Sequence, residues 1–454
     1  MKVRSSHLSA LTLAASLSGA TLANAALPYT DAVIDWNAIA VGALLTASSP
    51  PPVGTGRLSQ GTILDLAQVH AAVYDAVQAI ERRYQPYHVV IDDASGSPEA
   101  AAARAAHDVL VHLYPLQAAA LDTTYHDYFT QKGLSESDPG VDVGAAAAAG
   151  IIAFRANDGS YPDPPPVFVG GTDPGEWRPT TSYLPGPPPS GAPMAGVWLT
   201  TVRPFTLNSN MQFRAVKPPV LNSARYFHEY EEVRELGAFE GSTRTPAETD
   251  FAYFFATNYL VNWNQVAREV AGARVHHIAD SARLFALLDL SLADAVITAW
   301  DSKLYYNLWR PVTAIQEGDN DGNAKTVGDL NWTPLINTPN YPDYISGANT
   351  VTGAATRALA LFFGSDHVPF TFRTTNAVAT QRARDYTRFS DAAADVVEAR
   401  ILEGIHFRSA DTAGRQQGRH VAKWVFNHFL RPVNDDGVSD ASLDEDDSAE
   451  EDEQ

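Results

Sequence analysis

A lysine and an arginine seven residues apart close a long apolar segment. The stretch KLYYNLWRP carries Lys303 and Arg310 and follows the apolar run SARLFALLDLSLADAVITAW. A spacing of seven corresponds to two helical turns, so a helix that reaches this point would direct both cations to the same side. Pro311 disfavours helical geometry at Arg310 and predicts that the helix ends near it. The pair indicates either a solvated helix end or a site for an anion.

A second segment supplies a helix start. The stretch YPDYISGANTVTGA predicts an extended or turned piece of chain and then a helix that begins at Ser346 and Gly347. Free backbone N–H groups and a hydroxyl at a helix start can bind an anion. A serine at this position also serves as an ordinary N-cap, and the segment alone does not separate the two roles.

A third segment, EARILEGIHFRSAD, adds a cation and an imidazole. Arg400 precedes His406 by six residues, and Gly404 loosens the helix between them. A histidine after an apolar helix is often a buried structural residue, and we expect Asp411 to be the N-cap of the last helix. Taken together, the three segments provide guanidinium groups, an ammonium, backbone amides and one imidazole. That set suits a tetrahedral oxyanion, with a nitrogen able to attack or coordinate its central atom.

The elements that must position these groups are helices. Apolar residues recur at spacings of three and four in runs such as TILDLAQVHAAVYDAVQAIERRY. A capping box at residues 245–248 predicts a helix that reaches about Val270, and the next helix is predicted over residues 281–310. No convincing succession of strands is found. The fold class predicted is all-α, with helices packed in bundles.

One segment breaks the helical pattern. Residues 162–193 contain eleven of the 29 prolines. Proline removes a backbone donor and fixes the backbone, which excludes a helix or a central strand. The segment contains Trp177 and Tyr183, which a free linker has little use for. We therefore interpret it as a long ordered loop lying over the helices, rather than as a linker between domains.

The two ends of the sequence are interpreted as separate from the fold. Residues 1–25 have a basic start, an apolar run and a small-residue cleavage site, which together predict a secretory signal peptide and a secreted or periplasmic product. Residues 434–454 carry eleven acids and no base and are predicted to be a disordered, dispensable tail. Residues 26–433 are predicted to form a single all-α domain, with the motif-bearing core at about 281–430.

Composition excludes several function classes. The sequence has no cysteine, so thiolate chemistry and zinc–thiolate sites are excluded. The net charge of -21 makes nucleic acid an improbable partner. After the signal peptide, no run approaches the roughly 18 apolar residues of a membrane-spanning helix. We therefore expect an exported protein without a transmembrane segment.

The three motifs resemble a known signature. The pattern K-x6-R-P, a P-S-G-H-like turn and R-x5-H is shared by vanadium-dependent haloperoxidases and by acid phosphatases of the phosphatidic acid phosphatase type 2 superfamily. KLYYNLWRP matches the first part fully, and RILEGIH matches the third. Stretches such as PPVLNSARYFHEYEEVRELG and NWTPLINTPNYPDY resemble the bacterial secreted branch of the haloperoxidases. The resemblance covers most of residues 30–430.

The resemblance implies a role for each motif residue. Vanadate, or phosphate in a phosphatase, would be held by cations and by a helix start, namely Lys303, Arg310, Arg400, Ser346 and Gly347. His406 would be the axial ligand to vanadium, or the phosphoryl-accepting nucleophile in a phosphatase. Trp300 and Tyr341 would line the halide side. The implied partners are hydrogen peroxide, a halide and a small organic acceptor.

The sequence departs from the signature at the acid–base position. The histidine of P-S-G-H is Ala348 here, and alanine cannot transfer a proton. A phosphatase would lose its general acid, typically worth a factor of about 10²–10⁴, whereas peroxide activation depends more on the metal as a Lewis acid. We therefore predict a haloperoxidase-like enzyme acting on bromide or iodide rather than chloride. The alternatives are a phosphatase-type hydrolase and a non-catalytic phosphate-binding relative.

A second departure concerns the partner of His406. The aspartate expected four residues after the axial histidine is found five residues after it, as Asp411. Its pairing with His406 is therefore left open.

Overall fold

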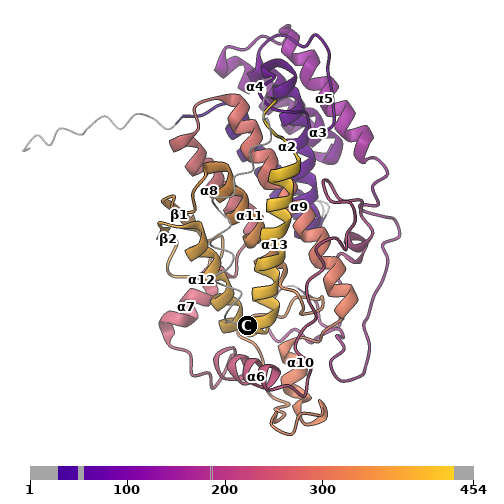
Figure 1. Cartoon of the computed structure of the whole chain (residues 1–454), viewed down its shortest axis with the longest axis vertical. Coiled ribbons are helices and arrows are strands. Elements are labelled where there is room, and N and C mark those ends of the chain that lie inside the picture. Colours follow the sequence, from indigo (N-terminus) through magenta and orange to yellow (C-terminus); the bar gives the residue numbers. More distant parts are fainter. Residues whose placement is uncertain (1–28, 50–55, 185, 187, 434–454) are drawn as a thin grey trace, which may run out of the picture.

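The computed structural model describes residues 29–49, 56–184, 186 and 188–433 (Figure 1). The predicted signal peptide and the predicted acidic tail lie outside the described residues. The α-helices are α1 Ala32–Ser48, α2 Ser59–Glu81, α3 Pro98–Leu113, α4 Ala118–Lys132, α5 Pro139–Arg155, α6 Ala224–Leu236, α7 Pro246–Phe255, α8 Tyr259–Arg274, α9 Ile278–Tyr306, α10 Pro311–Gln316, α11 Gly347–Phe363, α12 Phe389–Leu402 and α13 Arg408–His428. Short 3₁₀ turns lie at Pro115–Gln117, Val197–Thr200 and Gly318–Asn320.

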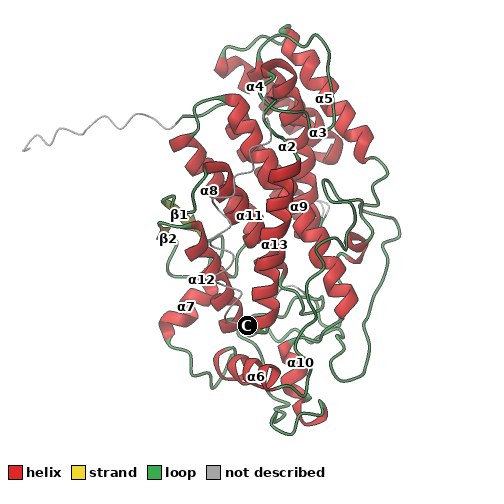
Figure 2. Ribbon diagram, in the orientation of Figure 1, coloured by secondary structure: helices red, strands yellow, loops and turns green. Residues whose placement is uncertain are grey.

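The helices are arranged along the long axis of the molecule. The N-terminal helices α2, α3, α4 and α5 gather at the upper end in Figure 1. The long helices α9, α11 and α13 run beside one another through the centre, and α6 and α10 lie at the lower end. The only strands in the described part of the chain form a small antiparallel hairpin, β1 Phe370–Arg373 with β2 Ala383–Tyr386 (Figure 2). The predicted all-α fold is confirmed.

The proline-rich segment is a long surface loop, as predicted. Its backbone is tied to the chain that follows α9, because the Trp177 amide donates to the Asn307 carbonyl at 2.7 Å and the Trp309 amide donates to the Gly175 carbonyl at 2.9 Å. The Trp177 side chain is fully buried. The loop is thus part of the packed structure beside the end of α9.

The capping-box helix is shorter than predicted. The box itself is present, since Thr245 and Glu248 each accept a hydrogen bond from the other's backbone amide. The helix nevertheless ends at Phe255, and α8 begins after Asn258, whose side chain accepts from the Val261 amide as an N-cap. Asparagine favours this capping geometry over a helix interior, and the run to Val270 was therefore predicted wrongly as one helix.

The close approach of α11 and α13 depends on glycines. A Cβ atom added to Gly353, Gly414 or Gly418 would lie 2.2, 2.5 or 2.0 Å from a carbonyl oxygen of the other helix. For Gly414 that oxygen belongs to Ser346, the residue that caps α11. The absent side chains let the two backbones touch, and this places the first turn of α13 directly against the start of α11.

We predict that Gly418→Ala destabilises the protein by about 1–3 kcal/mol, because the added methyl overpacks the contact with the Thr350 carbonyl. Gly42→Ala is the matched control: Gly42 lies on the exposed face of α1, and no atom lies within 4 Å of its Cβ position. That control should stabilise the protein by roughly 0.5–1 kcal/mol through the loss of glycine's backbone freedom. Denaturant unfolding of both variants measures the difference, and equal effects would show that α11 and α13 are not in contact here.

Candidate functional site

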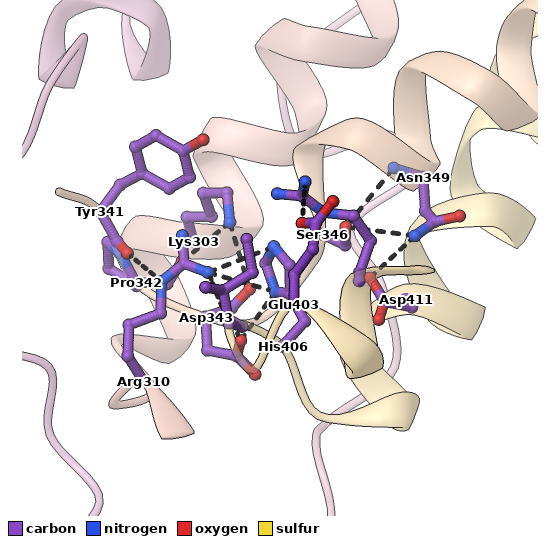
Figure 3. Close-up of polar contacts among 12 residues, drawn as sticks. Lys303, Arg310, Tyr341, Pro342, Asp343, Ser346, Asn349, Glu403, His406 and Asp411 are labelled. Carbon is purple, nitrogen blue, oxygen red and sulfur yellow. Dashed lines mark hydrogen bonds and ion pairs between the residues drawn. The ribbon is translucent and has the colours of Figure 1, made fainter. Parts of the chain in front are cut away.

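The three motif segments meet at one end of the central helices (Figure 3). Lys303 lies in the last turn of α9, Ser346 caps α11, and Arg400 lies in the last turn of α12. His406 lies between α12 and α13. The four sequence-predicted polar side chains at the centre are buried, with exposures of 0% for Lys303, 0% for Arg310, 7% for Arg400 and 1% for His406. The structure therefore brings the predicted residues together.

Arg310 reaches the site by a different route from the one predicted. Helix α9 ends at Tyr306, and Asn307 has the left-handed conformation, with φ of 46°. Arg310 itself is extended, with φ of -81° and ψ of 155°, and precedes α10, which starts at Pro311. The prediction that Lys303 and Arg310 share one helical face is therefore wrong, while the predicted effect of Pro311 is correct. The two side chains still converge, since both donate to backbone carbonyls of residues 341–343.

Both cations are held by the extended segment before α11. The Lys303 ammonium donates to the carbonyl of Pro342 at 2.8 Å and to that of Asp343 at 3.1 Å. The Arg310 Nε donates to the Tyr341 carbonyl at 2.7 Å. Carbonyl oxygens partly compensate for the lost hydration of a buried cation without neutralising its charge. The positive charge is thus fixed in position and remains available to an anion.

His406 is oriented by a carboxylate that sequence reasoning missed. Its Nδ1 lies 2.7 Å from Oδ1 of the fully buried Asp343, and its Nε2 lies 3.2 Å from Nη1 of Arg310. A carboxylate beside Nδ1 favours the tautomer that carries its proton there, so the lone pair is on Nε2. The YPDY stretch was interpreted only as extended or turned chain, and nothing in its spacing marked Asp343 as the partner.

The electrostatics of the cluster keep the imidazole neutral. Burial, followed by the charges of Arg310, Arg400 and Lys303, lowers the pKa of His406 well below its usual value. Burial and the neighbouring Arg310 likewise lower the pKa of Lys303 well below its usual value. Burial raises the pKa of Asp343 to about 7. A neutral imidazole with its lone pair on Nε2 is the form that coordinates a metal centre.

The donors that face no protein partner fit an oxyanion. Arg310 Nη1 donates to the Ile405 carbonyl at 2.6 Å, but Nη2 is buried and has no hydrogen-bond partner among the described residues. Arg400 forms an ion pair with Glu403 through Nη1, and its buried Nε is also without a partner in the described part of the chain. Unsatisfied buried donors are costly, and a bound oxyanion would satisfy both.

The start of α11 completes the set of donors. Ser346 is the N-cap predicted from the sequence, and its hydroxyl accepts from the Asn349 amide at 3.4 Å. The next amides, of Gly347 and Ala348, belong to the first helical turn and have no intrahelical acceptor. A side chain at Gly347 would lie 3.1 Å from the Trp300 ring, so glycine permits the close approach of this turn to α9. These residues fit the oxyanion role that the motif predicts.

The two aromatic residues predicted for the halide side lie next to Lys303. The rings of Trp300 and Tyr341 have centroids 5.0 Å apart, and the Lys303 nitrogen is 4.8 Å from the Tyr341 centroid. Trp300 is fixed by a 2.9 Å hydrogen bond from its indole nitrogen to the Ala195 carbonyl. The pair forms an apolar wall beside the cationic cluster.

Asp411 does not cap the last helix, contrary to the prediction. Helix α13 already begins at Arg408, and Asp411 is buried in its first turn. Its Oδ1 accepts a 2.8 Å hydrogen bond from the Asn349 side chain on α11. The partner of His406 is therefore Asp343, and Asp411 instead joins the starts of α11 and α13.

Comparisons with known proteins agree with this architecture. Residues 283–435 match the family model of the VCPO second helical-bundle domain. Vanadium chloroperoxidase of Curvularia inaequalis is 27% identical over a region that covers 36% of this chain and 31% of that protein. The chain thus matches about a third of the length of this curated relative.

Solved structures extend the likeness to most of the chain. The first bacterial vanadium-dependent iodoperoxidase superposes with a TM-score of 0.72 at 24% identity, covering 87% of this chain and 97% of that chain. A holo-type bacterial vanadium-dependent chloroperoxidase superposes with a TM-score of 0.64 at 17% identity, covering 89% and 98%. The resemblance to vanadium-dependent haloperoxidases, indicated by the motifs, is confirmed in the second helical bundle and in the fold.

We predict that inorganic phosphate binds at this site and that Arg310→Leu weakens its binding about 10- to 100-fold, since a charge-assisted hydrogen bond is worth roughly 1.5–3 kcal/mol. Arg408→Leu removes the same charge, but Arg408 is ion-paired with Glu232 and Glu398 and partly exposed. That control should bind phosphate like the wild type. Isothermal titration calorimetry measures both variants, with thermal unfolding to confirm that each is folded. Equal affinities in the two variants would place the phosphate elsewhere.

Proposed function

We propose that this chain is a vanadate-dependent haloperoxidase, which oxidises a halide with hydrogen peroxide and delivers the oxidised halogen to a small organic acceptor. The observation that carries the proposal is a neutral, buried imidazole, with its Nδ1 engaged by Asp343, among three buried cations. A tetrahedral oxyanion with a metal at its centre could interact with both the cations and the imidazole. The cations would form charge-assisted hydrogen bonds to its oxygens, and the imidazole nitrogen would coordinate its metal.

Different residues of the site would bind different parts of vanadate. Positive charge on the anion's oxygens would be balanced by Lys303, Arg310 and Arg400, and hydrogen bonds would come from Ser346 and the Gly347 amide. Nε2 of His406 would bind the vanadium. When bound, vanadate supplies a Lewis acid that activates peroxide towards attack by a halide.

The protein's own contribution is orientation and exclusion of water. Asp343 holds the Nδ1 proton of His406 and its backbone carbonyl accepts from Lys303, so one residue fixes both the ligand and a charge. Trp300 and Tyr341 provide the apolar wall at which a weakly hydrated halide could approach. Bromide and iodide are easier to oxidise than chloride and are the proposed substrates.

A phosphatase reaction at the same site is the competing function. It would use the same cations, with His406 accepting the phosphoryl group. It also needs a proton donor for the leaving oxygen, and the side chain of Ala348 at the start of α11 has none. We therefore favour halide oxidation.

The proposed setting is outside the cytoplasm, on the strength of the signal-peptide pattern at residues 1–25. Within the described residues, no helix combines the length and the apolar character needed to cross a membrane.

The proposed function predicts that the purified protein, incubated with orthovanadate and desalted, retains one vanadium per chain and then brominates or iodinates a phenol-type acceptor with peroxide. His406→Ala should abolish turnover, because the nitrogen that would bind vanadium is lost. Elemental analysis measures the metal, and absorbance of the halogenated acceptor measures turnover. Hydrolysis of p-nitrophenyl phosphate in place of halogenation would favour the phosphatase, and absence of both activities with phosphate bound would indicate a non-catalytic relative.

We also predict that Asp343→Ala weakens vanadate binding about 10- to 100-fold, the usual effect of removing the hydrogen-bond partner of a ligating histidine. Asp301→Ala is the matched control, since Asp301 is also an acid close to Lys303 in sequence but pairs with Arg214 outside the site. Equilibrium dialysis against orthovanadate measures both affinities. If the two variants bind vanadate equally well, Asp343 does not position the ligand.

A further inference from the structure

The proposed reaction consumes a proton, and the described residues at the site leave few groups to supply it. Ala348 has no proton to give. His406 is neutral, and its single ring proton faces Asp343. Glu403 is bound in an ion pair with Arg400. Among the described residues, the carboxyl that remains beside the start of α11 is that of Asp411.

Asp411 lies at the edge of the oxyanion site, beside the helix start that would hold the anion. Its Oδ1 accepts from the Asn349 side chain at 2.8 Å, and Figure 3 shows it next to Asn349 and Ser346. The carboxyl is close enough to Lys303 and Arg400 to influence the pKa of each. It thus borders both the hydroxyl and the cations that are proposed to contact the anion.

The contact between α11 and α13 fixes this position. Gly414, three residues after Asp411 in α13, lies against the carbonyl of Ser346, and Gly418 lies against that of Thr350. A side chain at either glycine would push the helices apart. Backbone packing of α13 on α11 therefore places Asp411 against the start of α11, where its side chain accepts from Asn349.

Asp411 differs from the other buried acids of the site in what surrounds it. Asp343 and Glu403 each lie within ion-pair distance of an arginine, whereas Asp411 is held by the neutral side chains of Asn349 and Ser346. Its Oδ2 is buried and has no hydrogen-bond partner among the described residues, a feature it shares with Oδ2 of Asp343 and Oε1 of Glu403. Burial raises the pKa of Asp411 well above its usual value, which favours the protonated carboxyl over the carboxylate. A protonated Oδ2 without an acceptor can donate to a bound oxyanion, whereas an ionised one would repel it.

We propose that Asp411 is the proton donor of the oxyanion site and provides the acid function that position 348 lacks. The inference rests on the proposed function, because it requires an oxyanion bound between the cations and the start of α11. It assigns a catalytic role to a residue in the first turn of α13.

The proton balance of the reaction shows where Asp411 would act. Halide, peroxide and one proton give hypohalous acid and water: the halide loses two electrons, and the O–O bond of peroxide is reduced and broken. The Asp411 carboxyl gives its proton to the peroxide oxygen that leaves as water, and solvent reprotonates the carboxylate. In the competing phosphatase reaction, the same proton would go to the leaving alcohol oxygen as its P–O bond breaks.

The test is Asp411→Asn, which keeps the size of the side chain and an oxygen for Asn349 but removes the acidic proton. We expect vanadate affinity to stay within about threefold of the wild type, while halogenation turnover falls roughly 10²–10⁴-fold, the usual contribution of a general acid. A purely structural residue would instead alter affinity and turnover together. Equilibrium dialysis and steady-state kinetics provide the two readouts.

The matched control is Asp289→Asn. Asp289 is also a fully buried acid, but it lies on α9. Asp289 accepts from Asn264 at 3.0 Å, and burial raises its pKa to about 7. It lies fourteen residues before Lys303 on the same helix, which corresponds to about 21 Å. Turnover of this variant should match the wild type, since only the general effect of removing a buried acid remains.

A rescue variant keeps the test decisive if Asp411→Asn is impaired for other reasons. Adding Ala348→His to Asp411→Asn places an imidazole on the first turn of α11, beside the same anion. We expect the double variant to recover at least tenfold in turnover over Asp411→Asn, at similar vanadate affinity. Recovery would show that the missing element was a proton donor and not the packing of α13.

The outcomes separate this inference from the proposed function. A wild type that halogenates, together with an equally active Asp411→Asn, overturns the role of Asp411 alone. Loss of vanadate binding in Asp411→Asn without rescue by Ala348→His also overturns it, in favour of a structural role. A wild type that binds vanadate but neither halogenates nor hydrolyses phosphate esters overturns the proposed function, and the proton-donor role with it.

Discussion

Burial of three cations within one cluster is the constraint on which the rest of the site depends. Removing an ammonium or guanidinium from water costs several kcal/mol even after the protein relaxes, and mutual repulsion adds to this cost. Backbone carbonyl oxygens offset much of this desolvation cost. Those of residues 341–343 accept from Lys303 and Arg310, and that of Ile405 accepts from Arg310. The extended path of the segment before α11 follows from this requirement, since a helix there would direct its carbonyls along its own axis.

The acids of the site have three different tasks because their surroundings differ. Glu403 balances Arg400, and Asp343 orients His406. Asp411 is the third, and its hydrogen bond comes from the neutral side chain of Asn349. Burial raises the pKa of all three acids, to about 7 for Asp343 and Glu403 and well above the usual value for Asp411. In our proposal, one pocket therefore holds both the cations that bind the anion and the acid that gives it a proton.

Local signals in the sequence predicted much of the site, and distant contacts account for what was missed. The helix start at Ser346, the stop at Pro311 and the meeting of Arg400 with His406 follow from capping, proline geometry and a motif. Helix α9 ends earlier than predicted because Asn307 adopts the left-handed conformation. Asparagine tolerates this conformation, but its presence alone does not predict it. Asp343 lies in an extended stretch with no periodicity, and its pairing with His406 spans 63 residues of sequence. Only the packed structure shows such a partner.

The proline-rich loop has a consequence for how this architecture can diversify. Its two backbone hydrogen bonds join the stretch around Trp177 to the residues on the α9 side of Arg310. Insertions or deletions near Gly175 would shift the residues next to Arg310, whose side chain we propose binds the anion. Tyr183, farther along the loop, is more exposed, and the described stretch around it makes no backbone hydrogen bond to residues 307–309. Loop length can therefore vary there with the least displacement of the charge cluster.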